Sequence, residues 1–346
     1  MKNKFRYAVL FSAIALMLCL AAGCGGGSSS GGDAKKDDGK MKIPEFLKVS
    51  SSSAGGAWYP INVSHNGHIE ALVKKMAPEA KLSIGLNPGG STANVKSVAG
   101  GQADIGICHT AIATMGYNGS APFDKPMKNV RHLLSINPAA VFIAVRADSN
   151  IHSIDDLKDK RIGFYPQGSL GNTIVEQLFE VSGFTIEDIK KNGGSISYLG
   201  FAEGPGQLAD NQVDCYTVLG SWPVTTLMEI DFNPGIRVIP VDDALFAKLN
   251  AKYPLYTQFE IPAGTFKSFN EPFKTVGSMV CLIATDKMSD DMAYIATKAF
   301  WDNLQDIKER AVDARGADLK TAMSGMGIPL HPGAAKYYKE KGMEVK

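Results

Sequence analysis

The chain has 346 residues, of which 45% are hydrophobic and 21% are charged, and its formal net charge is +1. This size and composition suit one large globular domain or two ordinary ones, with an ample hydrophobic core. The charge balance lacks the basic excess that indicates nucleic-acid binding. Neither a dinucleotide-binding fingerprint nor a P-loop is present.

The N-terminus has the form of a secretory signal. Three basic residues precede an apolar run over 7–22, which is shorter than the roughly 20 residues that a transmembrane helix needs. The run ends in LAAGC, which resembles a bacterial lipobox with Cys24 as the acylated residue. We therefore predict a signal peptide over 1–23, a flexible polar tether over 24–42, and a lipid-anchored protein that faces the periplasm or the cell exterior.

The first half of the remaining chain alternates strands, glycine-rich or serine-rich loops and helices. A strand over 46–49 runs into a loop that leads to Pro60 in the first turn of a helix. A second strand ends at Asn87, and Ser91 is predicted to cap the helix that follows. Because that helix begins at a sheet edge, its free amides suit a small anion or a carboxylate.

A second α/β unit begins near residue 161 and contains a second glycine loop, QGSLGN, over 167–172. Two apolar runs, over 141–145 and 276–284, flank most of this unit, and we expect them to pair as a two-stranded hinge. The run over 130–134 is predicted as a separate strand. The aromatic stretch over 253–266 is predicted to be irregular.

Three cysteines lie in predicted strands beyond the N-terminal region, namely Cys108, Cys215 and Cys281. Their odd number allows at most one disulfide, and buried free thiols are the expected state.

Several stretches, taken in this order, carry a resemblance to a known family: SSSAGGAWYP, NPGGSTANV, GGQADIGI, RADS, FAE, YPLYTQFEIPAGTF and LHPGAAKYYKEKG. From about Ile43 onward the chain resembles the TAXI solute-binding proteins of TRAP transporters. The resemblance implies a two-lobed α/β fold, the type II periplasmic-binding-protein fold, with a ligand cleft between the lobes and a two-stranded hinge. Lobe I would comprise 43–140 and 280–346, and lobe II would comprise 141–279.

The resemblance also implies a function. The protein would be a monomer that captures a small carboxylate, such as the amino acid glutamate or a dicarboxylate, and delivers it to a TRAP permease in the membrane. We expect no cofactor and no metal. The expected ligand-binding residues are Ser53, Gly55, Gly56, Ala57, Trp58, Tyr59, Asn87, Gly90, Ser91, Thr92, His109, Thr110, Gly168, Ser169, Leu170, Gly171, Asn172, Thr173, Ser221 and Trp222.

Three loops depart from the usual pattern of the family. Trp58-Tyr59 stands where a tyrosine pair is frequent, residues 108–110 replace a polar Gln-Ser-Asp triplet, and residues 168–173 carry a variant glycine-serine loop. All three loops are expected to face the cleft, so the departures bear on the identity of the ligand.

Other functions compete with this interpretation. Cys108 and His109 could act as nucleophile and base, but adjacent strand residues point to opposite faces of a sheet. His65 and His68 are three residues apart on a helix and could share a metal, although no cysteine or carboxylate has matching spacing. A binding protein of an ABC importer would have the same fold, and a structural lipoprotein without a ligand is the fourth possibility.

Overall fold

The computed structural model describes residues 40–345. The predicted signal peptide and most of the predicted tether, Cys24 included, lie outside the described residues. The strands are β1 (Phe46–Ser50), β2 (Ser83–Asn87), β3 (Ile105–His109), β4 (Val130–Arg146), β5 (Arg161–Phe164), β6 (Ser195–Tyr198), β7 (Cys215–Gly220), β8 (Ile236–Val238), β9 (Thr257–Ile261) and β10 (Phe273–Thr285).

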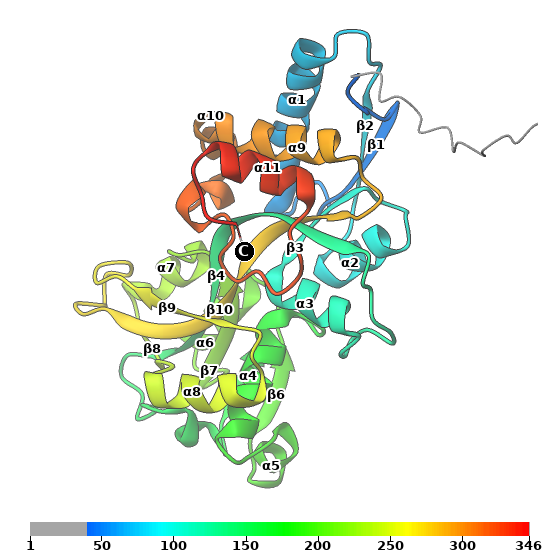
Figure 1. Ribbon diagram of the computed structural model, residues 1–346. Helices are drawn as coiled ribbons and strands as arrows, with labels where there is room; N and C mark the ends of the chain where they lie inside the picture. The colour runs from blue at the N-terminus through cyan, green and yellow to red at the C-terminus, as the bar shows by residue number, and fades with distance from the viewer. Residues whose placement is uncertain (1–39, 346) are drawn as a thin grey trace, which may run out of the picture. The chain divides into compact units, whose positions relative to one another are not determined.

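The helices alternate with these strands through most of the chain (Figure 1). They are α1 (Trp58–Met76), α2 (Ser91–Ala99), α3 (Thr110–Asn118), α4 (Leu170–Val181), α5 (Ile186–Lys191), α6 (Glu203–Ala209), α7 (Thr225–Asp231), α8 (Asp243–Lys252), α9 (Asp290–Asp302), α10 (Leu304–Arg310) and α11 (Pro332–Glu340), with short 3₁₀ helices at Ile154–Leu157, Val312–Ala314 and Leu319–Thr321. None of the described helices is long and apolar enough to cross a lipid bilayer.

Two long strands, β4 and β10, run through both halves of one mixed sheet (Figure 1). The strand order is β2-β1-β3-β10-β4-β7-β5-β6, with β8 beside β4 and β9 beside β10. The strands β1, β2 and β3 are mutually parallel in the first half, as are β5, β6 and β7 in the second. The antiparallel pair of β4 and β10 joins these two parallel blocks. This is the expected two-part α/β fold with two crossing strands.

The structure corrects the prediction for the crossing strands in two respects. The runs predicted as separate strands over 130–134 and 141–145 form one strand of 17 residues. The β10 run over 276–284 pairs mainly with residues 130–140, whereas 141–145 pair with β7. Pro138, which has no N–H to donate, lies within β4, and the register of pairing with β10 shifts between Pro138 and Ser135 and again between Leu134 and His132. The stretch predicted to be irregular contains β9, which pairs with β10.

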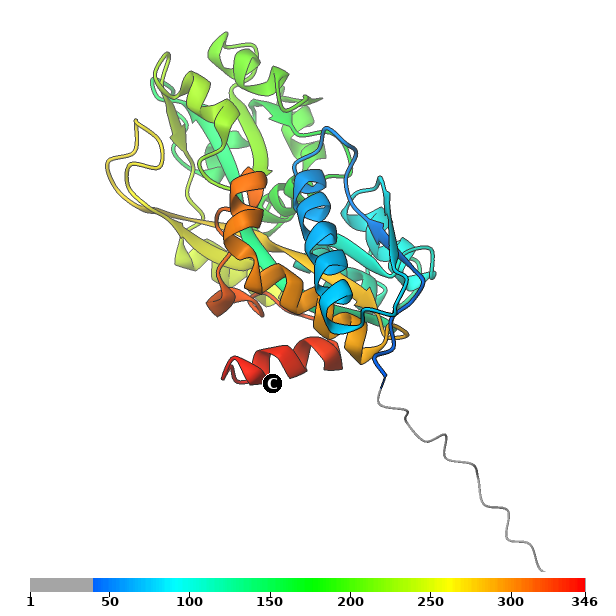
Figure 2. The same ribbon diagram turned by 90° about the horizontal axis from the view of Figure 1, so that it is seen from above.

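Helices cover the sheet, and buried residues of helices and strands together form the core. The apolar residues Ile61, Ile69 and Val73 of α1 pack in one cluster with residues of α9, α11 and the first three strands. Figure 2 shows α1, in light blue, beside the orange α9, with which it is in contact. These residues recur at helical spacing, so one face of α1 is buried.

Candidate functional site

The carboxyl ends of the two parallel blocks point toward each other. His109 ends β3 and lies opposite Val280 of β10. Gly220 ends β7 and lies opposite Ala140 of β4, which pairs in turn with Gly277 of β10. Because β3 and β7 run in opposite directions, their ends are separated along the strand direction by only the three residue steps from 277 to 280, about 10 Å at roughly 3.3 Å per residue. Ligands of α/β sheets bind at such carboxyl ends, so this is the candidate site.

One buried side chain of α2 connects the ends of two strands in the first half. Asn94 on α2 accepts a hydrogen bond from the Ser50 hydroxyl at 2.7 Å. Its amide group donates to the backbone oxygens of Ser51 at 3.0 Å and Ile107 at 2.7 Å. A Cβ on Gly89 would lie 2.0 Å from the Asn94 oxygen, so the loop before α2 requires glycine there. Asn94 thus connects the ends of β1 and β3 to α2, which the sequence pattern did not reveal.

The start of α2 differs by one residue from the prediction. Gly90 has the extended backbone of an N-cap, with φ −158° and ψ 171°, and its carbonyl accepts the first helical hydrogen bond, from Asn94. Ser91 is therefore the first helical residue and its hydroxyl is free for other partners. The Ser91 oxygen accepts from the His109 backbone N–H at 3.2 Å and hydrogen bonds to His109 Nδ1 at 2.9 Å.

The surroundings of His109 favour the neutral form of its imidazole. Burial lowers the pKa of its imidazole from 6.5 to about 4, because removal from water penalises the charged form. The ring of Trp58 meets the imidazole edge-on, with centroids 5.2 Å apart. Trp58, Ser91 and His109 are each partly exposed, so they form a polar and aromatic corner at the carboxyl end of β3.

The second half contributes the N-terminus of α4. Ser169 is its N-cap and accepts from the Asn172 backbone N–H at 3.3 Å. The Asn172 side chain donates to the backbone oxygens of Tyr165 at 2.7 Å and Pro166 at 3.2 Å, and so closes the loop. Gly168, with φ +81°, adopts a conformation that favours glycine. The predicted glycine loop is therefore a preformed turn in front of a helix N-terminus.

The crossing strands connect to both sets of loops. Asn137 of β4 donates to the Ser221 hydroxyl at 2.6 Å, just beyond β7. Ser278 of β10 hydrogen bonds to the Thr110 hydroxyl at 2.9 Å and accepts from the Ala111 backbone N–H at 3.0 Å. Sequence reasoning missed Asn137 and Ser278, although each is a polar residue within an otherwise apolar run.

The predicted ligand-binding residues divide into two groups. Four are buried, namely Thr110, Leu170, Gly171 and Asn172. The remaining ones are partly or fully exposed, namely Ser53, Gly55, Gly56, Ala57, Trp58, Tyr59, Asn87, Gly90, Ser91, Thr92, His109, Gly168, Ser169, Thr173, Ser221 and Trp222. All sixteen lie at or just beyond the carboxyl ends of β1, β2, β3, β5 and β7.

The competing site hypotheses find little geometric support. The Cys108 thiol lies 3.6 Å from that of Cys281, while the His109 ring bonds Ser91, so a thiol–imidazole pair is not formed. His65 Nε2 pairs with a backbone oxygen of α9 at 2.8 Å, and His68 Nε2 pairs with Asp306 at 2.7 Å. Within residues 40–345 no group of three histidine, cysteine or carboxylate side chains could hold a metal ion.

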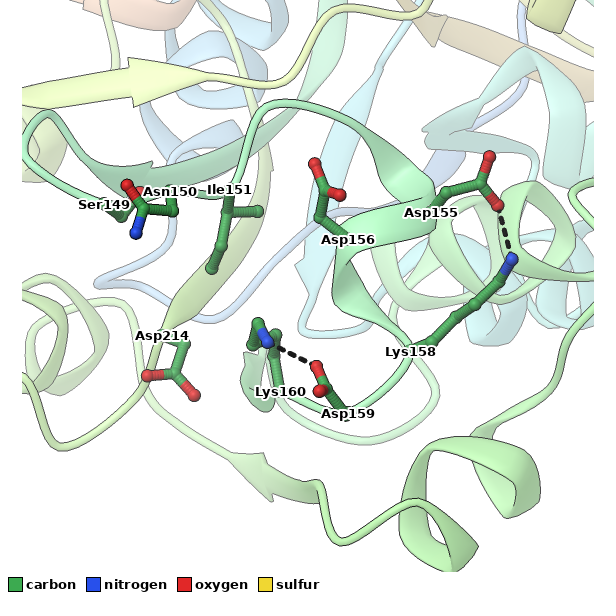
Figure 3. A pocket seen from close by; sticks show the side chains of 9 residues that line it. All are labelled: Ser149, Asn150, Ile151, Asp155, Asp156, Lys158, Asp159, Lys160 and Asp214. Carbon is green, nitrogen blue, oxygen red and sulfur yellow. Dashed lines mark hydrogen bonds and ion pairs between the residues drawn. The ribbon is translucent and has the colours of Figure 1, made fainter.

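A surface hollow of 680 Å³ lies at the opposite, amino end of β5 (Figure 3). Its acidic side chains already have partners within the protein. Asp155 pairs with Lys158 at 2.7 Å, Asp156 accepts from two backbone N–H groups at 2.9 Å each, and Asp214 pairs with Arg161 at 2.6 Å. The acidic groups of this hollow are therefore already paired within the protein, and the hollow is separate from the candidate site.

Comparison with solved structures defines the class of fold. The periplasmic sulfonate-binding protein SsuA from Methylobacillus flagellatus KT superposes with a TM-score of 0.51 at 15% identity, over 86% of this chain and 95% of that chain. The aliphatic sulphonate binding protein SsuA from Escherichia coli gives 0.46 at 16% identity, over 86% and 84% of the two chains. The L-cystine solute receptor of Neisseria gonorrhoeae gives 0.38 at 13%, over 79% and 95%. The fold is that of periplasmic binding proteins, for which the first similarity is the evidence.

A family model narrows this class. The NMT1-like family model matches residues 49–342, and the chain belongs to this family. The match covers nearly all of the described residues. The more specific resemblance to TAXI proteins stays a prediction.

Proposed function

We propose that this protein is an exported solute-binding protein that captures a small carboxylate and delivers it to a membrane permease. The observation that carries the proposal is the convergence of two carboxyl edges, one from each half, on the middle of β4 and β10. A ligand between these edges would contact both halves and hold them together. Family membership and fold are consistent with a binding role and give no support to catalysis.

The chemistry of the two edges favours an anionic ligand. The helices α2 and α4 have nine and 12 residues and begin at these edges. The unpaired amides and partial positive charge of each helix N-terminus are worth about 0.3–1 kcal/mol to an anion, or about 2 when partly buried. Ser91 and His109 are hydrogen-bonded to each other, so with a neutral imidazole this pair has one hydrogen left to donate to a ligand. No arginine lies in the loops 51–57, 87–92 or 166–173.

We therefore propose a carboxylate held by amides and hydroxyls, most simply glutamate or a related dicarboxylate. The test begins with native mass spectrometry of the purified protein, which would reveal a retained ligand. Calorimetry then compares acidic amino acids, dicarboxylates, neutral amino acids, alkanesulfonates and sugars. Binding of an acid with no binding of sugars is expected. A preference for uncharged sugars would overturn the carboxylate proposal and leave the fold unaffected.

Single substitutions test whether the two helix N-termini bind the ligand. Ser91→Ala and Ser169→Ala should each weaken binding by about 0.5–2 kcal/mol, the scale of one hydrogen bond, or somewhat more if the partner is charged. Ser120→Ala is the matched control, because this exposed serine lies beyond α3 and outside the site. Unchanged affinity in both site variants would place the ligand elsewhere.

The delivery partner is a second part of the proposal. A TRAP permease is the partner implied by the resemblance of the sequence, and an ABC importer is the alternative with the same fold. Purified protein with its ligand should support uptake into vesicles that contain its cognate permease. Uptake driven by an ion gradient without ATP would support the TRAP assignment, and uptake that requires ATP would establish the ABC alternative.

Membrane attachment is the third part. The lipobox-like sequence before Cys24 predicts acylation of that cysteine, and a single chain gives reversible attachment that further acyl chains strengthen. Cys24→Ala should release the protein from washed membranes into the soluble fraction. Membrane retention of this variant, at the level of the unaltered protein, would contradict lipid anchoring.

A further inference from the structure

Two cysteines lie directly opposite each other on paired strands. Cys108 of β3 is the register partner of Cys281 of β10 in an antiparallel pair. Their sulfur atoms are 3.6 Å apart, and both residues are 0% exposed. The third described cysteine, Cys215 of β7, is also buried but pairs across the ladder with Val145 and Ile162. Only one pair among these three cysteines is therefore placed to react.

We propose that Cys108 and Cys281 form a disulfide in the exported protein. Directly opposed residues of an antiparallel pair have Cα atoms about 4.5–5.5 Å apart, within the range of about 4.4–6.8 Å that a disulfide spans. The sulfur atoms have to approach by a further distance of about 1.5 Å to reach the bond length near 2.05 Å. The proposal rests on the proposed export, because disulfides persist in oxidising compartments outside the cytoplasm.

The bond forms by thiol–disulfide exchange with a protein disulfide of the oxidoreductase class. One thiolate of the pair attacks the oxidant's disulfide and releases one oxidant thiol. The second thiolate then attacks the mixed disulfide and releases the other, so two protein thiols are oxidised while one disulfide is reduced. Burial raises the pKa of the Cys281 thiol in the folded protein and shields it from large reagents. The exchange therefore takes place as the exported chain folds, before β3 and β10 are covered.

The position of the bond has a consequence for the candidate site. His109 follows Cys108 directly, and its register partner Val280 precedes Cys281. A covalent link at this point would fix the corner made by Trp58 and His109 to the segment of β10 that follows Val280. Any bending of β10 during closure would then fall on the residues before Val280, in the region where β10 meets β4 and β9.

The test uses peptide mapping of the full chain without reduction, in two arms. In one arm the protein is exported by its own leader in a bacterial host, and in the other the purified, denatured and reduced chain is refolded in a glutathione redox buffer. The protein is then unfolded in denaturant without reductant, and free thiols are blocked with iodoacetamide before digestion, because the three cysteines are buried in the folded chain. We expect a linked peptide pair that contains Cys108 and Cys281 in both arms, with Cys215 alkylated, and loss of the pair after dithiothreitol.

The two arms separate failure of the bond from failure of export. Alkylated Cys108 and Cys281 in the refolded protein would overturn the disulfide itself. A link in the refolded protein, but free thiols in the cellular protein, would overturn its formation in the cell and count against export. Reduction should lower the melting temperature of the unaltered protein and of Cys215→Ser by roughly 4 to 16 °C. It should leave the melting temperature of Cys281→Ser unchanged, and an equal response in all three proteins would also overturn the proposal.

Discussion

Replacement of Asn94 by alanine should destabilise the protein and loosen the attachment of α2 to the ends of β1 and β3. The side chain is 0% exposed and makes three hydrogen bonds, with Ser50, Ser51 and Ile107. Since a buried hydrogen bond contributes a net 0.5–1.5 kcal/mol, the three together amount to roughly 3 kcal/mol. The corresponding drop in melting temperature is about 6 to 12 °C.

A second substitution at the same position distinguishes lost hydrogen bonds from a lost volume. Asn94→Asp keeps the shape and the acceptor for Ser50, but it places a carboxylate oxygen against the backbone oxygens of Ser51 and Ile107. We expect Asn94→Asp to be at least as destabilising as Asn94→Ala. If the cost came from the cavity alone, aspartate would be the milder change.

The assay is urea unfolding at neutral pH, followed by circular dichroism, with ligand affinity measured on the folded variants. Asn150→Ala serves as the control, because this asparagine is exposed and far from the carboxyl edges. It should unfold at the midpoint of the unaltered protein. An Asn94→Ala midpoint equal to that of the control would refute the role assigned to Asn94.

Three further predictions follow from other features. Gly277→Ala should lower stability by about 1–3 kcal/mol, because its Cβ would lie 2.0 Å from the Ala139 carbonyl oxygen and force β4 and β10 apart, and thermal unfolding measures this loss. Burial lowers the pKa of His65 and of His132 from 6.5 to about 4. The folded state therefore binds fewer protons than the unfolded state below pH 6.5. The free energy of unfolding should be highest above pH 6.5 and should fall by up to roughly 3 kcal/mol per histidine as the pH drops to 4. Urea titrations at several pH values measure this loss. Ligand addition should change tryptophan fluorescence, and Trp58→Phe should remove most of the change; an undiminished change would assign it to another tryptophan.

Local sequence signals explain why many loops could be predicted correctly. Glycine, proline and serine clusters mark where strands end, and the apolar spacing marks which helix face is buried. The end of β2 at Asn87 and the first turn of α1 at Pro60 were therefore read correctly from the sequence alone. These rules act over a few residues, so they operate without knowledge of the tertiary fold.

Long-range pairing could not be read in the same way. The runs that became β4 and β10 are almost continuously apolar because they are buried on both faces. Such runs lack the alternation of apolar and polar residues that fixes register. The sequence therefore does not show which run pairs with which. Asn94 was missed for a related reason, since a polar residue in a helix does not show which loops it will reach.

The crossing strands allow the two halves to move relative to each other while each half keeps its internal hydrogen bonds. Asn137 of β4 is bonded to the loop beyond β7, and Ser278 of β10 is bonded to the start of α3. Both contacts lie close to the level at which β3 and β7 end, while the two crossing strands themselves run through both halves. A change of a few φ and ψ angles between these attachment points would alter the separation of the two carboxyl edges. The hydrogen bonds of Asn94 in one half and of Asn172 in the other would stay intact during that change, because each lies within a single half. Closure around a ligand would then require new contacts only at the edges, which is where the neutral donors lie.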